Sequence, residues 1–159
     1  MAGNILFQSG GISYALQTSG NGVQVANAAA SACSGPATGY IDNTGASGGP
    51  RFWGLVEFFA AKSGWGGNVN AGSTIDLYLV PSRDGTKFAD VDIAGATLPA
   101  NHYVGSFVVT KSGNNQASLM IPAIPLLPVL YQPYIVNNLG QNITSGWAMT
   151  MSTFDESYT

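Results

Sequence analysis

The chain has 159 residues, enough for one domain with its own hydrophobic core. Charged residues make up only 8% of it, against about 25% in an average soluble domain. The net charge is −3 and the five basic residues are scattered, which argues against direct binding of nucleic acid. Because a free monomer usually keeps more charge for solubility, this scarcity predicts that part of the surface is covered in an assembly.

The cysteine count and the apolar segments indicate the compartment in which the protein assembles and whether it enters a membrane. Cys33 is the only cysteine, so an intrachain disulfide framework is excluded and assembly in a reducing cytoplasm is expected. The first residues show no basic segment followed by an apolar stretch, so no signal peptide is expected. Residues 119–136 are apolar and long enough to span a bilayer, but four prolines interrupt them. We therefore expect no membrane partner.

In chain order, apolar residues alternate or form short runs between turn residues, and none holds a helical period. This pattern predicts strands throughout. The expected strands cover residues 12–17, 40–41, 52–61, 74–80, 104–110, 117–121, 134–136 and 147–151. Residues 26–32 are small, and their pattern does not decide between a short helix and an extended connection.

The strongest apolar run, residues 52–61, is hydrophobic on both faces. One face holds Phe52, Val56 and Phe58, and the other holds Trp53, Leu55 and Phe59. A strand of this kind is typical of a sheet interior with a covering layer above and below. Glu57 interrupts the second face, so its carboxylate should be paired or lie near an edge.

The fold class follows from the spacing of the strands. About eight strands, with turn signals about every 8 to 15 residues, predict an all-β fold, an antiparallel β-sandwich or its jelly-roll form. A single β-sandwich domain is expected over residues 1–159. Residues 1–50 hold hardly a charge before Asp42 and cannot form a large core alone, which leaves open whether they include an extended arm.

Two patterns resemble reactive sites but lack the context that those sites need. Residues 45–49 match the letters of a G-x-S-x-G nucleophile elbow, yet no buried strand and helix flank them, and His102 is the only histidine. Asp84, Asp90 and Asp92 could offer oxygen ligands to calcium, but the ligand positions and closing glutamate of an EF-hand are missing. We therefore expect no enzyme activity, no metal and no cofactor.

Trp65 is flanked by glycines and is the one aromatic residue that the sequence places on a loop. Aromatic residues on loops bind sugars or protein partners in many β-sandwiches, so a carbohydrate-binding module is an alternative function. The competing interpretation, that Trp65 folds back onto its own sheet edge, is left open.

Several short motifs carry a family resemblance over roughly residues 52–151. They are Thr74-Ile-Asp-Leu-Tyr-Leu-Val-Pro-Ser-Arg-Asp-Gly-Thr-Lys-Phe-Ala-Asp, Val104-Gly-Ser-Phe, Ile124-Pro-Leu-Leu-Pro and Tyr134-Ile-Val-Asn-Asn-Leu-Gly-Gln. In this layout the chain resembles small structural proteins of tailed-bacteriophage virions. The resemblance implies a capsid decoration or cement protein on the surface of the virion, with a tail or head-fibre role as the alternative. No active site is implied.

The expected partners are the major capsid protein and further copies of this chain. Residues 1–50 match no pattern of the family, and Ile5, Leu6 and Phe7 among them, together with Trp65, are the candidate partner contacts. Repeated contacts across a symmetric shell give avidity without a strong single interface. A homotrimer on a local threefold axis is the arrangement that we prefer from the sequence, because closed rings suit symmetric shells.

Overall fold

The computed structural model describes residues 5–8, 12–17, 24–33, 40–45, 50–60, 65, 67–88, 91, 98–113 and 118–158, with only the backbone described for 5–8 and 156–158. Its strands are β1 (Ile5–Gln8), β2 (Ser13–Gln17), β3 (Ala30–Ala32), β4 (Ile41–Asp42), β5 (Trp53–Phe59), β6 (Thr74–Ser82), β7 (Tyr103–Val108), β8 (Ser118–Pro125), β9 (Leu130–Asn138) and β10 (Ala148–Tyr158). A short 3-10 helix, η1 (Ala100–His102), precedes β7. The all-β prediction is confirmed for the described part of the chain.

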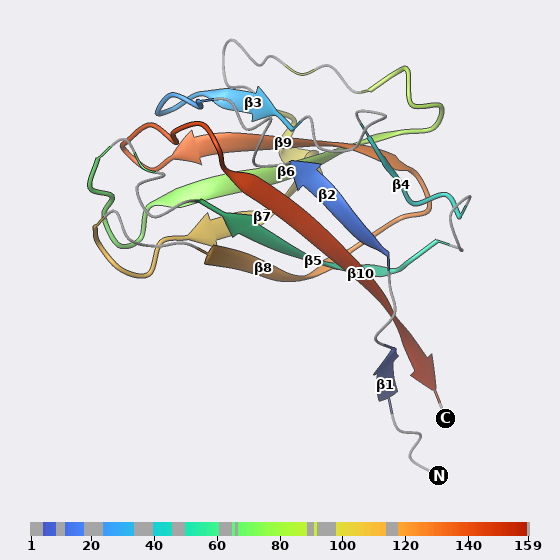
Figure 1. The fold of residues 1–159 in the computed structure, drawn as a ribbon. Coiled ribbons are helices and arrows are strands. Elements are labelled where there is room, and N and C mark those ends of the chain that lie inside the picture. The colour runs from blue at the N-terminus through green and yellow to red at the C-terminus, as the bar shows by residue number, and fades with distance from the viewer. Residues whose placement is uncertain are drawn as a thin grey trace.

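The strands form two antiparallel sheets that pack face to face (Figure 1). Sheet 1 has the order β2-β10-β5-β8, and β1 pairs with the far end of β10. Sheet 2 has the order β3-β9-β6-β7, and β4 also pairs with β9. If β1 is set aside and β3 and β4 are taken as two parts of one edge strand beside β9, the chain alternates between the sheets except at the β6-β7 connection. This order is that of a jelly roll built from two Greek keys.

The core lies between the sheets, where every second residue of each strand points inward. Phe58 of β5 sits at its centre. Its ring stacks on Trp147 with centroids 5.5 Å apart, on Trp65 at 6.1 Å, and tilts against Phe107 of sheet 2 at 5.6 Å. Aromatic contacts of this kind add to the free energy gained from burying apolar area, so this cluster fixes how the two sheets face each other.

Sheet 2 carries a second, smaller apolar cluster on its outer face. Val80, Tyr134 and Val136 of the sheet pack there against Leu98 and Phe88 of the connection between β6 and β7. The chain therefore covers part of this outer face by itself.

In the folded chain one open local question is decided and one local expectation changes. Residues 26–32 form no helix, because Ala30–Ala32 pair with β9 as β3. The strand predicted to end at residue 80 continues through Pro81, which lies opposite Tyr131 in the register. No described helix is long and apolar enough to cross a membrane.

Candidate functional site: an uncovered apolar sheet face

The outer face of sheet 1 is apolar and has no covering layer among the described residues. Its side chains come from β5, β8 and β10, and we call the following set the apolar face: Trp53, Leu55, Phe59, Met120, Pro122, Pro125 and Phe154. Phe59 is 46% exposed and Met120 is 58% exposed. Among the described residues, the expectation that β5 has a layer on both sides is therefore wrong, because Phe59 is exposed and Trp53 and Leu55 are partly exposed.

A β-bulge widens the exposed part of β8. Val56 pairs with Ile121 and Gly54 with Ile124, so Pro122 and Ala123 together oppose the single residue Leu55. Ala123 has a φ of 46°, in the left-handed region that a bulge of this kind can require. Pro122 and Ala123 both lie exposed at the sheet edge, and the proline there lacks an N–H that another strand could pair with.

The apolar face carries little charge. Glu57 is the only charged residue in β5, β8 and residues 148–154 of β10. The Ser118 hydroxyl donates a hydrogen bond of 2.6 Å to the Glu57 carboxylate, so of the two expected arrangements the carboxylate has the paired one. Exposed apolar patches are found at surfaces that contact a protein, a membrane or a ligand.

The end of β10 extends beyond the sandwich and pairs with β1 (Figure 1). We call residues 5–8 and 155–158 the ribbon. Ile5, Leu6 and Phe7 thus belong to a strand paired with β10, and whether they contact a partner stays a prediction, because their side chains lie outside the described structure.

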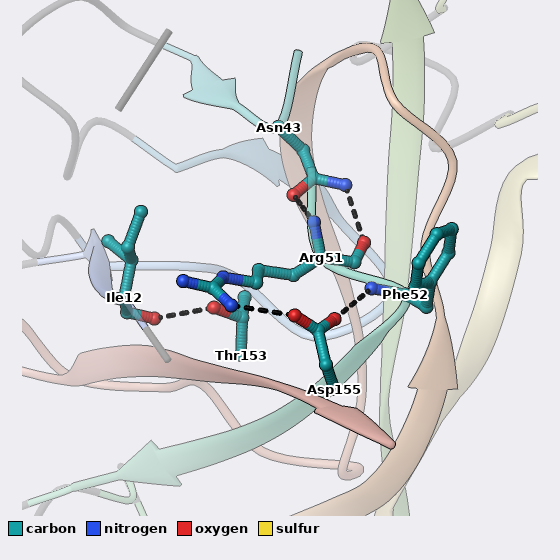
Figure 2. A network of polar contacts seen from close by, with 6 residues as sticks. All are labelled: Ile12, Asn43, Arg51, Phe52, Thr153 and Asp155. Atoms are coloured by element: carbon teal, nitrogen blue, oxygen red, sulfur yellow. Dashed lines mark hydrogen bonds and ion pairs between the residues drawn. The ribbon is translucent and has the colours of Figure 1, made fainter. Parts of the chain in front are cut away.

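A network of polar contacts holds the base of the ribbon (Figure 2). The Arg51 guanidinium and the Asp155 carboxylate form an ion pair of 2.6 Å, and the second oxygen of Asp155 accepts a 3.1 Å hydrogen bond from the Phe52 N–H. The backbone N–H and the hydroxyl of Thr153 both donate to the Ile12 carbonyl, at 3.0 and 2.9 Å. These contacts set the direction in which the ribbon leaves the sandwich.

Asn43 connects this base to sheet 2. Its side-chain amide donates to the carbonyls of Arg51 and Leu127, at 2.9 and 2.8 Å, and its oxygen accepts from the Arg51 N–H at 3.0 Å. The sequence did not identify the residues of this network, which are Asn43, Arg51, Phe52, Leu127 and Asp155. Only the scarcity of basic residues singles out Arg51, and no spacing rule links residues 51 and 155.

Trp65 does not lie at the surface. It is only 4% exposed, forms a β-bridge with Ile143 and stacks on Phe58. The interpretation of Trp65 as a residue presented to a sugar or a partner is therefore wrong, and the alternative, that it folds back onto its own sheet, is correct. Burying the large indole ring removes apolar area from water, and this stabilises the folded chain.

The outer face of sheet 2 carries a polar cluster with one exposed aromatic ring. The Ser106 hydroxyl and the Asn138 amide donate to the two oxygens of Asp76, at 2.6 and 2.8 Å. The Tyr103 hydroxyl lies 2.7 Å from Ser106, and the Tyr103 ring meets Tyr78 edge-on. Burial, then Asp76 and Tyr103, raise the pKa of Tyr78, so this phenol stays protonated and neutral.

The structure describes only some of the residues that the sequence suggested for a calcium site or a nucleophile. Asp84 accepts hydrogen bonds from the backbone N–H groups of Thr86 and Lys87, both at 2.9 Å, so its carboxylate closes its own turn. Asp90, Asp92 and residues 46–49 lie outside the described residues. No group of three or more potential metal ligands occurs in the described ranges.

His102 ends η1 and lines an open groove of about 290 Å³ with Tyr103, Pro125 and Leu127. Within the described ranges, no hydrogen bond joins its ring to a serine or a carboxylate. Comparison of the chain with models of protein families, with curated proteins and with solved structures gives no match.

Proposed function

We propose that this chain is a structural protein of a virus particle, most specifically a capsid decoration protein of a tailed bacteriophage. In this proposal it docks on the shell of the major capsid protein through the apolar face. The observation that carries the proposal is the contrast between the two sheets: sheet 2 covers part of its outer face with its own chain, whereas Phe59 and Met120 of sheet 1 remain exposed.

The energetics of such a face favour docking to protein. Burying a side chain the size of Met120 contributes about 1.5–3 kcal/mol, and an interface core is typically apolar with a polar rim. Ser118, Glu57 and Thr150 provide polar groups on the same face, which allow a defined orientation. A shell presents the same acceptor many times, so copies that also contact one another gain avidity from modest single contacts.

The fold and the motifs agree with this proposal without deciding it. Jelly rolls occur in viral capsid proteins and in lectins, and a fold alone does not specify a function. The motif in residues 74–90 supplies β6 and the turn after it, where the Ser82 hydroxyl accepts from the Gly85 N–H at 3.0 Å. These residues build the scaffold, which is the role expected of them in a structural protein.

The test is co-sedimentation of the purified protein with capsids assembled without it. Wild-type protein should sediment with the capsids and raise their melting temperature. The Met120→Glu variant places a charge in the middle of the apolar face, so its affinity should fall at least about 10-fold, the equivalent of the lost burial.

The matched control is Val108→Glu. Val108 is 48% exposed, on the outer side of β7 in sheet 2, so this variant introduces the same charge on the other side of the sandwich. It should bind capsids like the wild type. The proposal fails if wild-type protein does not bind capsids, or if both variants bind equally well. Binding to isolated tails instead of capsids would assign the protein to the tail.

A carbohydrate-binding module remains the second candidate, on a different residue from the one that the sequence indicated. The exposed ring of Tyr103 lies beside the Asp76 carboxylate and the Asn138 amide, and a ring next to such groups can stack on a sugar and bond its hydroxyls. Titration with cellohexaose, chitohexaose and maltohexaose tests this. Binding that Tyr103→Ala abolishes while capsid binding persists would favour this second function.

A further inference from the structure

Neither outer edge of the ribbon is paired with a described strand, and the edge on β10 is the one that continues the line of β5. Along residues 148–154, β10 has β5 on one side, and the last pair of that register joins Phe154 to Trp53. Residues 155–158 pair with β1 on the opposite side only. Phe52, which precedes β5, still contacts Asp155, so the edge of β10 that β5 covers is vacant from residue 156 onward in the described part of the chain.

The backbone groups that face this vacant edge can be identified. The Thr153 N–H points toward the β2 and β1 side, because it donates to the Ile12 carbonyl. Backbone groups of successive strand residues point to opposite edges, so residues 155 and 157 also face β1. Residues 156 and 158 consequently direct their N–H and C=O groups to the vacant edge, and such a row is a ready template for another strand.

One exposed apolar residue lies next to this edge. Phe52 directly precedes β5, its carbonyl accepts a 2.8 Å hydrogen bond from the Leu126 N–H, and its own N–H donates a 3.1 Å hydrogen bond to the Asp155 carboxylate. Phe52 is 59% exposed. A strand added beside residues 156–158 continues the line of β5, so its end lies next to Phe52.

We propose that two copies of this chain associate through the vacant β10 edges of their ribbons. A two-stranded ribbon is marginally stable alone, whereas pairing two ribbons gives a four-stranded antiparallel sheet. The second copy is the occupant that fits, because each copy supplies both a vacant edge and the exposed residue Phe52 at its end. Such an interface is isologous, with a twofold axis.

The register of the pairing follows from the backbone directions. Residue 156 of each copy exchanges hydrogen bonds with residue 158 of the other copy. Every backbone N–H and C=O group that faces the vacant edge then has a partner. Ser157 then lies opposite its own copy on the twofold axis, as a pair without mutual hydrogen bonds, with Cα atoms about 4.5 Å apart. Asp155 brings no unpaired charge to this interface, because Arg51 compensates its carboxylate.

This interface differs from the threefold arrangement expected from the sequence, and it does not depend on the virion assignment. Sedimentation equilibrium of the purified chain should give twice the monomer mass of 16.4 kDa. The Glu156→Pro variant lacks an N–H that faces the vacant edge and should sediment as a monomer. Glu156→Ala removes the same carboxylate but keeps the N–H, and it should remain a dimer.

Cross-linking tests the register independently of any loss of folding. In a Cys33→Ser background, Ser157→Cys should form a disulfide-linked dimer with oxidised glutathione, because a non-hydrogen-bonded pair lies within disulfide range. Glu156→Cys faces residue 158 and should cross-link at least 10-fold more slowly. Equal cross-linking of the two variants would overturn the proposed register.

Surface variants separate this interface from the capsid-docking face. Phe52→Ser should weaken dimerisation about 10-fold, whereas Phe59→Ser on the apolar face should leave the dimer intact. Wild-type protein that stays monomeric at about 100 µM, or that forms a trimer insensitive to Glu156→Pro, would overturn the proposal. Either result leaves the capsid-binding test unaffected, so the two proposals fail separately.

Discussion

Replacing Asn43 by alanine should destabilise the protein by about 2–4 kcal/mol. Asn43 is only 1% exposed, and its side chain makes three hydrogen bonds of 2.8 to 3.0 Å to the backbone of Arg51 and Leu127. A buried hydrogen bond contributes about 1 kcal/mol net, and a buried group left without a partner costs about 1–3 kcal/mol. Leu127 keeps the Tyr131 hydroxyl as a second donor at 3.3 Å, so the loss at its carbonyl is partial.

Urea unfolding, monitored by tryptophan fluorescence and circular dichroism, measures this loss. The urea concentration at the midpoint should fall, while the slope of the unfolding free energy against urea stays unchanged. At about 2–4 °C per kcal/mol for a chain of this size, the melting temperature should fall by about 5–15 °C. The matched control is Asn138→Ala, which removes one exposed hydrogen bond to Asp76 and should cost less than about 1 kcal/mol. Equal losses for Asn43→Ala and Asn138→Ala would refute the reasoning.

Three further predictions concern the core, a turn and the thiol. Phe58→Ala should cost about 3–5 kcal/mol in urea unfolding, because the cavity lies among three aromatic rings, and a loss under 1 kcal/mol would contradict the described core. Hydrogen bonds from Thr86 and Lys87 lower the pKa of Asp84 to about 2, so its stabilising contribution is present above about pH 4 and is lost as the pH falls toward 2. An NMR titration of the Asp84 carboxyl that gives an ordinary pKa would rule this out, and Asp84→Asn should lose this pH dependence. Burial raises the pKa of Cys33, so its thiol should react with a disulfide reagent only after unfolding, and rapid reaction of the native protein would show the site to be open.

Much of the strand content could be predicted because alternation is a local property. Leu16, Ile75 and Leu77 fall on the buried side of β2 and β6, as their spacing predicted. Strand ends were less accurate, since Pro81 lies within β6, where its position opposite Tyr131 of β9 outweighs its local preference for a turn. The pairing of β1 with β10 joins residues more than 140 positions apart, and no local pattern reports it.

The candidate site depended more on the tertiary structure than the strands did. The sequence correctly showed that β5 is apolar on both faces, but it predicted two covering layers where the described chain supplies one. Trp65 looked exposed because glycines flank it, whereas Phe58 and Ile143 enclose it in the fold. The burial of a side chain depends on which distant segments pack against it, and composition does not specify those contacts.

The amino-acid sequence by itself determined the all-β class, the low charge and the inward side of most strands, because side-chain alternation and turn chemistry act over a few residues. Only the tertiary structure decided that the sheets follow jelly-roll order, that no described segment covers the outer face of sheet 1, and that Arg51 meets Asp155 at the base of the ribbon. Those features arise from contacts between segments far apart in the chain, where packing of the whole core selects one arrangement among many that satisfy the same local rules.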